Sequence, residues 1–511
     1  MGIVAKQSVW NTITLFTGVF LGAINTMLLF PMILEPEQYG LTRIIVTVGI
    51  LAAQFAMMGM PAILVKFLHK FRKEEGRSYG LLPFVLVSCI IGVVVVLVAM
   101  YFGKSIILLP YEDSAESLSD KFHLLFPLVF FITLTGVLSS YLKAVFHSVF
   151  QLVVSEIFMR IAQTALLVMY SFGWFDFDLF MWLFVLLYGV DAALLLFYLI
   201  KIGELDLKMD KEVVNKENKR NFYKYGIANF FSGIGFRLSN MIDVLMISAM
   251  IGTIGMDSDV GLKAVAIYSL AAYISSVIEM PARAIGNIAF TLVGKAWADG
   301  NLADINKLYR KSAINQLVVG GLVFVGIWVN IDNIIFLLND ISKESYDYSQ
   351  IKYVVFFLGL AKLFHVASGI NGGIIITSKY YLFGTYVTVG LIFITFFTNW
   401  IFIPMYGIVG AAIATAISLL LFNIISFLFL LVKFKLQPFT LKTLLTIGIG
   451  IGAYFFVKLL PEMGSPFVDL LLQSLIVICI YIPLIIGLKI SEDINTLANK
   501  VSMRFGIKLM K

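Results

Sequence analysis

Long apolar runs recur along the whole chain and alternate with short polar segments. A helix crosses a bilayer with about 20 apolar residues, and roughly fourteen runs in this sequence are that long. The spans we predict are residues 8–33, 40–66, 81–103, 121–146, 150–172, 177–201, 222–251, 263–294, 310–333, 351–377, 380–403, 406–432, 439–460 and 467–489. The pattern therefore predicts an all-α polytopic membrane protein with about 14 transmembrane helices.

The composition supports this class and limits the chemistry. Of the 511 residues, 60% are hydrophobic and 14% are charged, which excludes a soluble domain of this size. Both cysteines, Cys89 and Cys479, fall inside predicted spans, so no disulfide framework is available. With four histidines and no Cys/His cluster, a zinc site is not expected. We expect no cofactor apart from coupling to Na⁺ or H⁺.

Basic side chains gather in alternate loops. Examples are the segments 66–77 and 216–224 and the tail 500–511, whereas the loops 112–120 and 257–259 are acidic. Because Lys and Arg mark cytoplasmic loops, we predict that both termini are cytoplasmic and that the number of spans is even. The net charge of +7 thus indicates sidedness rather than binding to nucleic acid.

Two sequence patterns occur twice. The motif Phe16-Thr17-Gly18 with Asn25 returns as Phe231-Ser232-Gly233 with Asn240, and Met60-Pro61-Ala62 returns as Met280-Pro281-Ala282. Because each copy holds an even number of spans, the two halves should be parallel bundles related by a pseudo-twofold axis along the membrane normal. Two such bundles can enclose a cavity and rock about it, which is the basis of alternating access.

The repeat divides the chain into three parts. We predict an N-terminal six-helix bundle over 1–215, a C-terminal six-helix bundle over 216–435, and two additional transmembrane helices with a cytoplasmic tail over 436–511. The additional helices are candidates for a lateral lipid groove. Pro61 and Pro281 should each lie inside a span, where proline bends a helix. The sequence leaves open whether each bend is a static kink or a hinge.

Two cations fall near the middle of predicted spans. An ionised side chain at mid-bilayer costs on the order of 2.5–3.5 kcal/mol on insertion scales, so it usually faces water or a partner. Arg237 in the seventh span has Gly22 as its repeat counterpart, which favours a ligand role over a structural ion pair. Lys362 in the tenth span shares one helical stripe with His365, Gly369 and Gly372. That stripe could line a cavity or form a packed helix contact.

Two further arginines have alternative interpretations. Arg43 near the outer end of the second span, like Lys263 in a similar place, is best explained as a snorkelling interfacial cation, with substrate contact as the alternative. Arg160 in the fifth span and Asp191 in the sixth occur at similar depths, which favours a structural pair over substrate contact. Glu156 lies one turn from Arg160 and could share it.

Intramembrane acids are candidates for ion coupling. Asp243 lies one turn from Ser239 and Asn240, and this group of oxygens could hold Na⁺, or the carboxyl could carry a proton. Glu279 is spaced i,i+4 from Arg283, so mutual neutralisation is its favoured role and coupling the alternative. Asp191 is a further coupling candidate.

Three segments resemble one family of transporters. Gln7-Ser8 through Asn11, the loop Glu35-Pro36-Glu37-Gln38-Tyr39-Gly40-Leu41 and the run Tyr406-Gly407-Ile408-Val409-Gly410-Ala411-Ala412-Ile413-Ala414-Thr415 are similar to bacterial polysaccharide flippases. These are the O-antigen and capsule repeat-unit exporters of the multidrug/oligosaccharidyl-lipid/polysaccharide (MOP) superfamily. The resemblance implies a two-bundle transporter of twelve to fourteen helices in the bacterial inner membrane, acting in polysaccharide and lipopolysaccharide biosynthesis.

The resemblance also implies a cargo and its contacts. Members of this family move undecaprenyl-pyrophosphate-linked oligosaccharides from the cytoplasmic to the outer leaflet, and relatives that flip lipid II carry arginines in a central cavity. Because a guanidinium binds pyrophosphate oxygens bidentately, we expect the substrate contacts to be Arg237, Lys362, Arg160 and Arg43. Membrane lipids are the other expected partner of a monomeric protein that is not an enzyme.

Two other functions remain open at this stage. A cation-coupled exporter of drugs or metabolites on the same fold would need an acid-dominated cavity, which Arg237 and Lys362 oppose. An integral-membrane polysaccharide polymerase would need a large external loop, and an acyltransferase would need a positioned histidine. His365 is the one intramembrane candidate for that role, and it has no evident catalytic partner in the sequence.

Overall fold

A computed structural model describes residues 3–71, 80–109, 115–205, 207–209, 213, 215–252, 259–343, 346–461 and 464–504. Within these ranges some helical side chains, including those of Arg237, Asn240 and Arg283, lie outside the described residues. The described chain divides by packing into two compact units. Unit 1 comprises residues 1–269 and 342–346, and unit 2 comprises residues 270–341 and 347–511.

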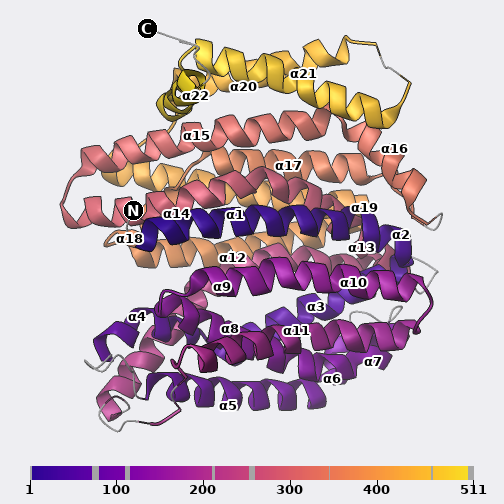
Figure 1. Cartoon of the computed structure of the whole chain (residues 1–511), viewed down its shortest axis with the longest axis vertical. Helices are drawn as coiled ribbons and strands as arrows, with labels where there is room; N and C mark the ends of the chain where they lie inside the picture. Colours follow the sequence, from indigo (N-terminus) through magenta and orange to yellow (C-terminus); the bar gives the residue numbers. More distant parts are fainter. Residues whose placement is uncertain are drawn as a thin grey trace. The chain divides into compact units, whose positions relative to one another are not determined.

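Unit 1 is built from helices that run alongside one another (Figure 1). Its elements are α1 (Ile3–Ala23), η1 (Ile24–Leu29), α2 (Phe30–Ile33), α3 (Pro36–Met57), α4 (Pro61–Phe71), α5 (Leu81–Phe102), α6 (Lys104–Leu108), α7 (Ala115–Lys121), η3 (Phe122–Leu124), α8 (Leu125–Ala144), α9 (Ser148–Leu152), η4 (Val153–Phe158), α10 (Met159–Ser171), α11 (Phe177–Lys201), α12 (Lys216–Gly252) and most of α13 (Val260–Ser276). Helix α8 packs against α3, α5 and α11 and forms the centre of this bundle.

Unit 2 has the same all-helical character. Its elements are the end of α13, η5 (Val277–Glu279), α14 (Met280–Ala298), α15 (Leu302–Val329), α16 (Ile331–Ile341), α17 (Ile351–Ala367), α18 (Asn371–Thr377), α19 (Tyr381–Phe434), α20 (Leu441–Lys458), α21 (Pro466–Gly487) and α22 (Glu492–Arg504). Figure 1 shows α20 and α21 side by side next to α15, and their apolar faces meet in a cluster that includes Val325, Ala453 and Val477.

Most predicted spans correspond to observed helices. Among the described residues, eleven helices are long and apolar enough to cross a membrane, and twelve if the bent pair α17–α18 is one span. The all-α membrane fold is therefore confirmed, whereas the total of fourteen stays a prediction. The division by packing places α12 and most of α13 in unit 1, with the helices that precede them. The three parts predicted from the repeat stay predictions: a bundle over 1–215, a bundle over 216–435 and two further helices over 436–511.

Helix α19 contains a sharp reversal although its 54 residues are helical almost throughout. Gly407 has φ 58° and ψ −135°, and Pro404 lies three residues before it. On either side of this point Thr398 Oγ1 lies 3.1 Å from Ser418 Oγ, so the two arms pack antiparallel. The arms agree with the predicted spans 380–403 and 406–432, and glycine is used because a side chain is disfavoured at positive φ.

The two Met-Pro-Ala motifs lie where the helix geometry changes. Met58 and Gly59 have φ values of 40° and 72°, which end α3, and Pro61 is the first residue of α4. Pro281 lies in the first turn of α14, directly after the 3₁₀ turn η5. Pro61 therefore begins a new helix, where proline without its N–H fits best, whereas Pro281 lies inside the uninterrupted helical run of α13, η5 and α14, next to its 3₁₀ turn.

The loop before α3 forms contacts both with the start of α3 and with Lys343. Glu35 and Gln38 form a reciprocal capping box at the start of α3, in which the Glu35 N–H donates to Gln38 Oε1 at 3.1 Å. The Glu35 carboxylate also pairs with Lys343 Nζ at 2.8 Å. The backbone N–H of Lys343 donates to Pro31 O at 3.3 Å. Lys343 is therefore bound to this early loop by both its side chain and its backbone.

Candidate functional site

Two arginines of unit 1 belong to one polar cluster within the helices. Tyr188 on α11 lies within electrostatic reach of Arg43 on α3, Arg160 on α10 and Asp191 on α11. The Nε atoms of both arginines are buried without a hydrogen-bond acceptor, and no ion pair to either guanidinium occurs in the described part of the chain. We call these four residues the arginine cluster. It brings together three residues that the sequence singled out.

The main chain of Arg160 is anchored by the π-helical turn η1, which follows α1 directly. Asn25 is completely buried, its Nδ2 donates to the Arg160 carbonyl at 2.8 Å, and its Oδ1 accepts from Thr164 Oγ1 at 2.6 Å. Asn25 lies in the π-helical turn η1, and the second π-helical turn η4 ends two residues before Arg160. Such wide turns are frequent at functional sites. Here they align α1 with the carbonyl of Arg160.

Asp191 does not pair with Arg160, contrary to the favoured sequence interpretation. The Asp191 carboxylate is 3% exposed and accepts a hydrogen bond from Ser155 Oγ at 3.2 Å. Ser155 lies in η4, and Gln151 Nε2 approaches its hydroxyl at 3.5 Å. Hydroxyl donors thus take the place expected for the guanidinium. Glu156 and Arg160 likewise form no ion pair among the described residues.

Both cations that the sequence suggests as snorkelling residues contact protein groups, and their depth in a membrane stays a prediction. The guanidinium carbon of Arg43 lies 5.3 Å from the ring centroid of Tyr39, whose side chain is fully buried, and the Arg43 Nε is buried. Lys263 Nζ pairs with Glu37 Oε1 at 3.0 Å. Both cations therefore interact with protein groups, because α3 offers an aromatic face and a carboxylate within their reach.

Asp243 is the buried acid of α12. It is 3% exposed, and the Tyr268 hydroxyl donates to its Oδ2 at 2.5 Å. Ser239, one turn away, is also buried. Asn240 and Arg237 belong to the same helix, but their side chains lie outside the described residues. Their predicted roles stay predictions.

In unit 2, Lys362 forms an ion pair with Glu279. Lys362 Nζ lies 3.1 Å from Glu279 Oε1, and the two side chains are 12% and 8% exposed. This pair joins α17 to the 3₁₀ turn η5. Lys362 is thus not an unpaired cation, and a substrate phosphate would have to compete with a carboxylate for it. The side chain of Arg283, the other partner considered for Glu279, lies outside the described residues.

The predicted polar stripe on the tenth span does not continue along one helix. Helix α17 ends at Ala367, Gly369 has φ +65°, and α18 leaves at an angle of 50°. His365 lies before the break, where its Nδ1 is 3.2 Å from the Asn423 side chain. Asn371 at the start of α18 donates to the same Asn423 Oδ1 at 3.1 Å. An amide network therefore holds the broken span together.

An apolar pocket lies between α15, α17, α20 and α21. Its volume is about 370 Å³, and its lining includes Phe324, Trp328, Phe356, Tyr454 and Phe455. Gly321 and Gly450 also line it. The pocket lies next to the two helices that the sequence predicts as a lipid groove, and its chemistry suits a hydrocarbon chain.

The family model for polysaccharide biosynthesis proteins matches residues 5–290. This match covers more than half of the chain. The chain belongs to the polysaccharide biosynthesis protein family. No curated protein sequence matches it.

Solved structures show the fold of this family member. A structure described as "Lipid II flippase MurJ, inward closed conformation" is similar with a TM-score of 0.73 and 17% identity, covering 93% of this chain and 98% of that one. An inward-facing MATE multidrug resistance transporter of the MOP superfamily is similar with a TM-score of 0.62 and 16% identity, covering 83% and 93%. A MATE in the bent conformation gives 0.52 and 16%, covering 84% and 95%. The chain therefore has the fold of the MurJ and MATE structures, which is the fold that the sequence resemblance implies.

Three residues near the candidate sites were not found by sequence reasoning. Tyr188 and Thr164 look like ordinary span residues, and Ser155 gains its role from the π-helical turn η4. Asn25 was noticed as a repeat position, without its contact to Arg160. A buried asparagine inside an apolar run is a signal that could have identified it, because a buried amide needs partners.

Proposed function

We propose that this family member is a flippase that translocates a polyprenyl-pyrophosphate-linked oligosaccharide from the cytoplasmic to the outer leaflet by alternating access. The observation that supports it best is the arginine cluster. Arg43 and Arg160 come from two helices of unit 1, their Nε donors are buried, and no carboxylate among the described residues neutralises either one. Such cations are costly within a membrane unless an anion or water receives their charge.

A pyrophosphate matches these side chains. Its oxygens accept hydrogen bonds from the planar guanidinium in a bidentate manner, and such charge-assisted bonds are about twice as strong as neutral ones. A lysine at either position would present a point charge without this fork. Two arginines on separate helices would therefore recognise a diphosphate group, and a sugar of varied structure could extend away from it.

Unit 2 by itself holds an apolar pocket whose chemistry suits a hydrocarbon chain. A polyprenyl chain needs a nonpolar surface, and the aromatic lining from Phe324 to Phe455 provides one. Moving a charged sugar head group through bare hydrocarbon would be prohibitively slow. A protein that carries the head group past polar side chains while the tail remains apolar removes most of that barrier.

Coupling to an ion is part of the proposal. Asp243 is buried next to Ser239 and receives the Tyr268 hydroxyl, so its carboxylate oxygens lie in a polar site on α12. Buried intramembrane acids commonly mark ion or proton pathways. We assign Asp243 the coupling role, with Na⁺ or H⁺ as the ion and Asn240 as the predicted neighbour.

The experiment that tests the substrate compares arginine variants in a defined transport assay. Wild type, Arg43→Gln, Arg160→Gln and Arg160→Lys would be reconstituted in liposomes with a lipid-linked oligosaccharide whose head group is detected after crossing. We expect each Gln variant to lower the rate at least about tenfold, since one charge-assisted hydrogen bond contributes roughly 1.5–3 kcal/mol. The Lys variant should fall in between.

Lys433→Gln provides the matched control, because Lys433 is an exposed cation far along the chain from the cluster. Its rate should equal that of the wild type. Undiminished transport by both Gln variants at equal protein level would overturn the assigned substrate contacts. Export of cationic drugs instead of the lipid-linked sugar would favour the alternative function, a drug exporter like the multidrug resistance transporter that one MATE structure is named after.

A further inference from the structure

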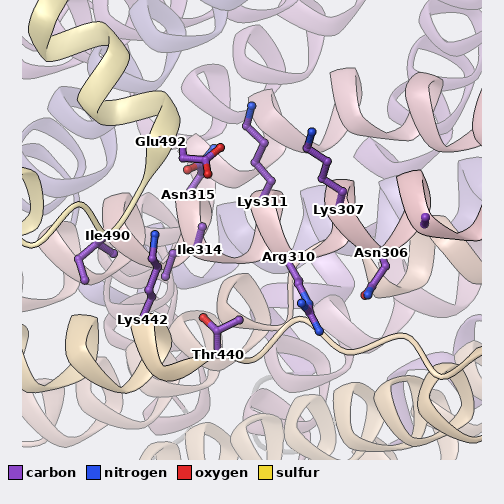
Figure 2. A pocket seen from close by; sticks show the side chains of 11 residues that line it. Asn306, Lys307, Arg310, Lys311, Ile314, Asn315, Thr440, Lys442, Ile490 and Glu492 are labelled. Carbon is purple, nitrogen blue, oxygen red and sulfur yellow. The ribbon is translucent and has the colours of Figure 1, made fainter.

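A basic pocket lies at one end of unit 2, away from the residues discussed so far. It has a volume of about 470 Å³ and is formed by the first turns of α15, the start of α20 and the residues around the start of α22. Lys307, Arg310 and Lys311 line it from α15, and Lys442 lines it from α20 (Figure 2). Glu492 is the one acid in the lining.

Three of the four lining cations form no ion pair among the described residues. Arg310 Nε donates to the Gln437 carbonyl at 3.1 Å, and Lys442 Nζ donates to the Lys489 carbonyl at 2.8 Å. Both acceptors are neutral carbonyl groups, so the hydrogen bonds fix the positions of Arg310 and Lys442 without neutralising their positive charge. Within the described ranges Lys307 has no ion pair. Lys311 alone is paired, with Asp493 at 2.7 Å.

The position of Lys442 is unfavourable for the helix that carries it. It is the second residue of α20, which begins after the capping box formed by Thr440 and Thr443. The first turn of a helix carries a partial positive charge, so a cation there is disfavoured and an anion is favoured. An anion bound in the pocket would offset the repulsion between the Lys442 cation and the partial positive charge of the helix start. Thr440 lines the same pocket.

An apolar groove lies further along the same face of α20. Leu445, three residues after Lys442, lines a groove of about 570 Å³ between α20 and α21 together with Gly448 and Ile480. Ile490 and Ile314 belong both to the basic pocket and to the apolar cluster that Ile449 joins. Charge at one end and hydrocarbon surface along the helix are the two requirements of a lipid with an anionic head group.

We propose that this pocket binds the phosphate head group of an anionic phospholipid, with an acyl chain along the α20–α21 groove. The positive-inside rule accounts for the presence of Lys and Arg at this end of the helices. It does not account for four of them lining one pocket, with two held by neutral carbonyls beside an apolar groove. The site is separate from the arginine cluster, and it does not depend on the proposed transport substrate.

The test measures binding to the full-length protein in detergent. The probes are dioctanoyl phosphatidylglycerol, dioctanoyl phosphatidylcholine and inorganic phosphate, and the readouts are the concentration-dependent rise in melting temperature and native mass spectrometry. We expect phosphatidylglycerol to bind, and phosphatidylcholine and inorganic phosphate to bind at least tenfold more weakly. Equal binding of inorganic phosphate would overturn the assignment to a lipid.

Variants locate the site. K307Q/R310Q should weaken phosphatidylglycerol binding at least tenfold, and K307R/R310K, which retains both charges, should stay within about threefold of wild type. K295Q/K433Q is the matched control, since it removes two exposed cations of unit 2 that do not line the pocket. Wild-type binding by K307Q/R310Q, or an equal loss in K295Q/K433Q, would overturn the proposal.

Discussion

Lys362 and Glu279 form a largely buried ion pair, with 3.1 Å between Nζ and Oε1. The pair links α17 to the 3₁₀ turn η5, next to the start of α14. A buried pair of this kind contributes little net stability, but loss of one partner leaves a buried charge without compensation. The pair therefore offers a way to separate a structural role of Lys362 from a role in substrate binding.

Lys362→Met and Glu279→Gln should each lower stability by about 3–5 kcal/mol, and the double variant should lose less than either single variant. Denaturant unfolding in detergent measures this, and a double-mutant cycle gives the coupling energy. If the double variant folds and still transports at the wild-type rate, Lys362 is structural. Strictly additive losses would show that the pair is not coupled.

Asn25→Ala should loosen the anchor of Arg160. The substitution removes the hydrogen bonds of Asn25 to the Arg160 carbonyl and the Thr164 hydroxyl. Because Thr164 Oγ1 also donates to that carbonyl at 3.0 Å, we expect a loss of about 0.5–1.5 kcal/mol per hydrogen bond. We expect a lower melting temperature and a transport rate reduced beyond what the stability loss explains. Asn11→Ala is a comparison, because Asn11 on the same helix bonds to Ser148 instead. Equal transport defects in the two variants would contradict a special role for Asn25.

Gly410→Ala should destabilise the hairpin within α19. A Cβ at Gly410 would lie 1.9 Å from the Phe402 carbonyl oxygen, so the two antiparallel arms would have to separate. Overpacking of this kind typically costs about 1–3 kcal/mol and sometimes more. Gly390→Ala in the same helix is the control, because nothing lies within 4 Å of its added Cβ. The measurement is the melting temperature of each variant in detergent. Similar values for the two variants would contradict a close approach between Gly410 and the Phe402 carbonyl.

The contact between α15 and α22 should weaken in acid. Partial burial alone would raise the pKa of the Asp493 carboxyl, but hydrogen bonds from Lys311 and Asn315 and the charge of Lys311 together lower it. A lowered folded-state pKa stabilises the protein above the unfolded value, which is about 3.9 for Asp. The contribution is lost as the pH falls through the folded pKa.

We expect the melting temperature of wild type to fall more steeply than that of Asp493→Asn as the pH drops below about 4. The difference should be small, because the Asp493 side chain is 48% exposed. High salt should reduce it further, since an exposed pair is screened. Parallel pH profiles for the two proteins would show that this carboxylate does not stabilise α22.

Asp243→Asn should abolish the dependence of transport on an ion gradient. The amide cannot release a proton and is a weaker ligand for Na⁺ than a carboxylate. Liposome transport would be compared with and without Na⁺ and pH gradients. Tyr268→Phe, which removes only the hydroxyl that donates to Asp243, should shift the ion dependence without abolishing it. A gradient response retained by Asp243→Asn would assign coupling to another acid, of which Asp191 and Glu279 are the predicted alternatives.

The fold was accessible from the sequence because a bilayer imposes long apolar runs. The reversal in α19 lies between two predicted spans, and α20 and α21 agree with the last two. The breaks were harder to predict, because apolar periodicity continues across them. Nothing in the hydropathy pattern distinguishes a proline that bends a span from Pro61, which begins a new helix after Met58 and Gly59 adopt positive φ.

Side-chain partners were harder still to predict. Equal depth suggested a pair of Arg160 with Asp191, but depth does not fix which face of a helix a residue occupies, and a π-helical turn changes that face. Ser155 in η4 consequently reaches Asp191, and Arg160 does not. In the same way, Lys362 was predicted to be an open cation because its partner Glu279 is more than eighty residues away in the sequence.

The clasp between Lys343 and the loop at Glu35 has a consequence for biogenesis. Two residues that are 308 positions apart form it, so this ion pair closes only after the chain has been synthesised as far as Lys343. Until then the loop at the start of α3 has its own capping box but not this contact.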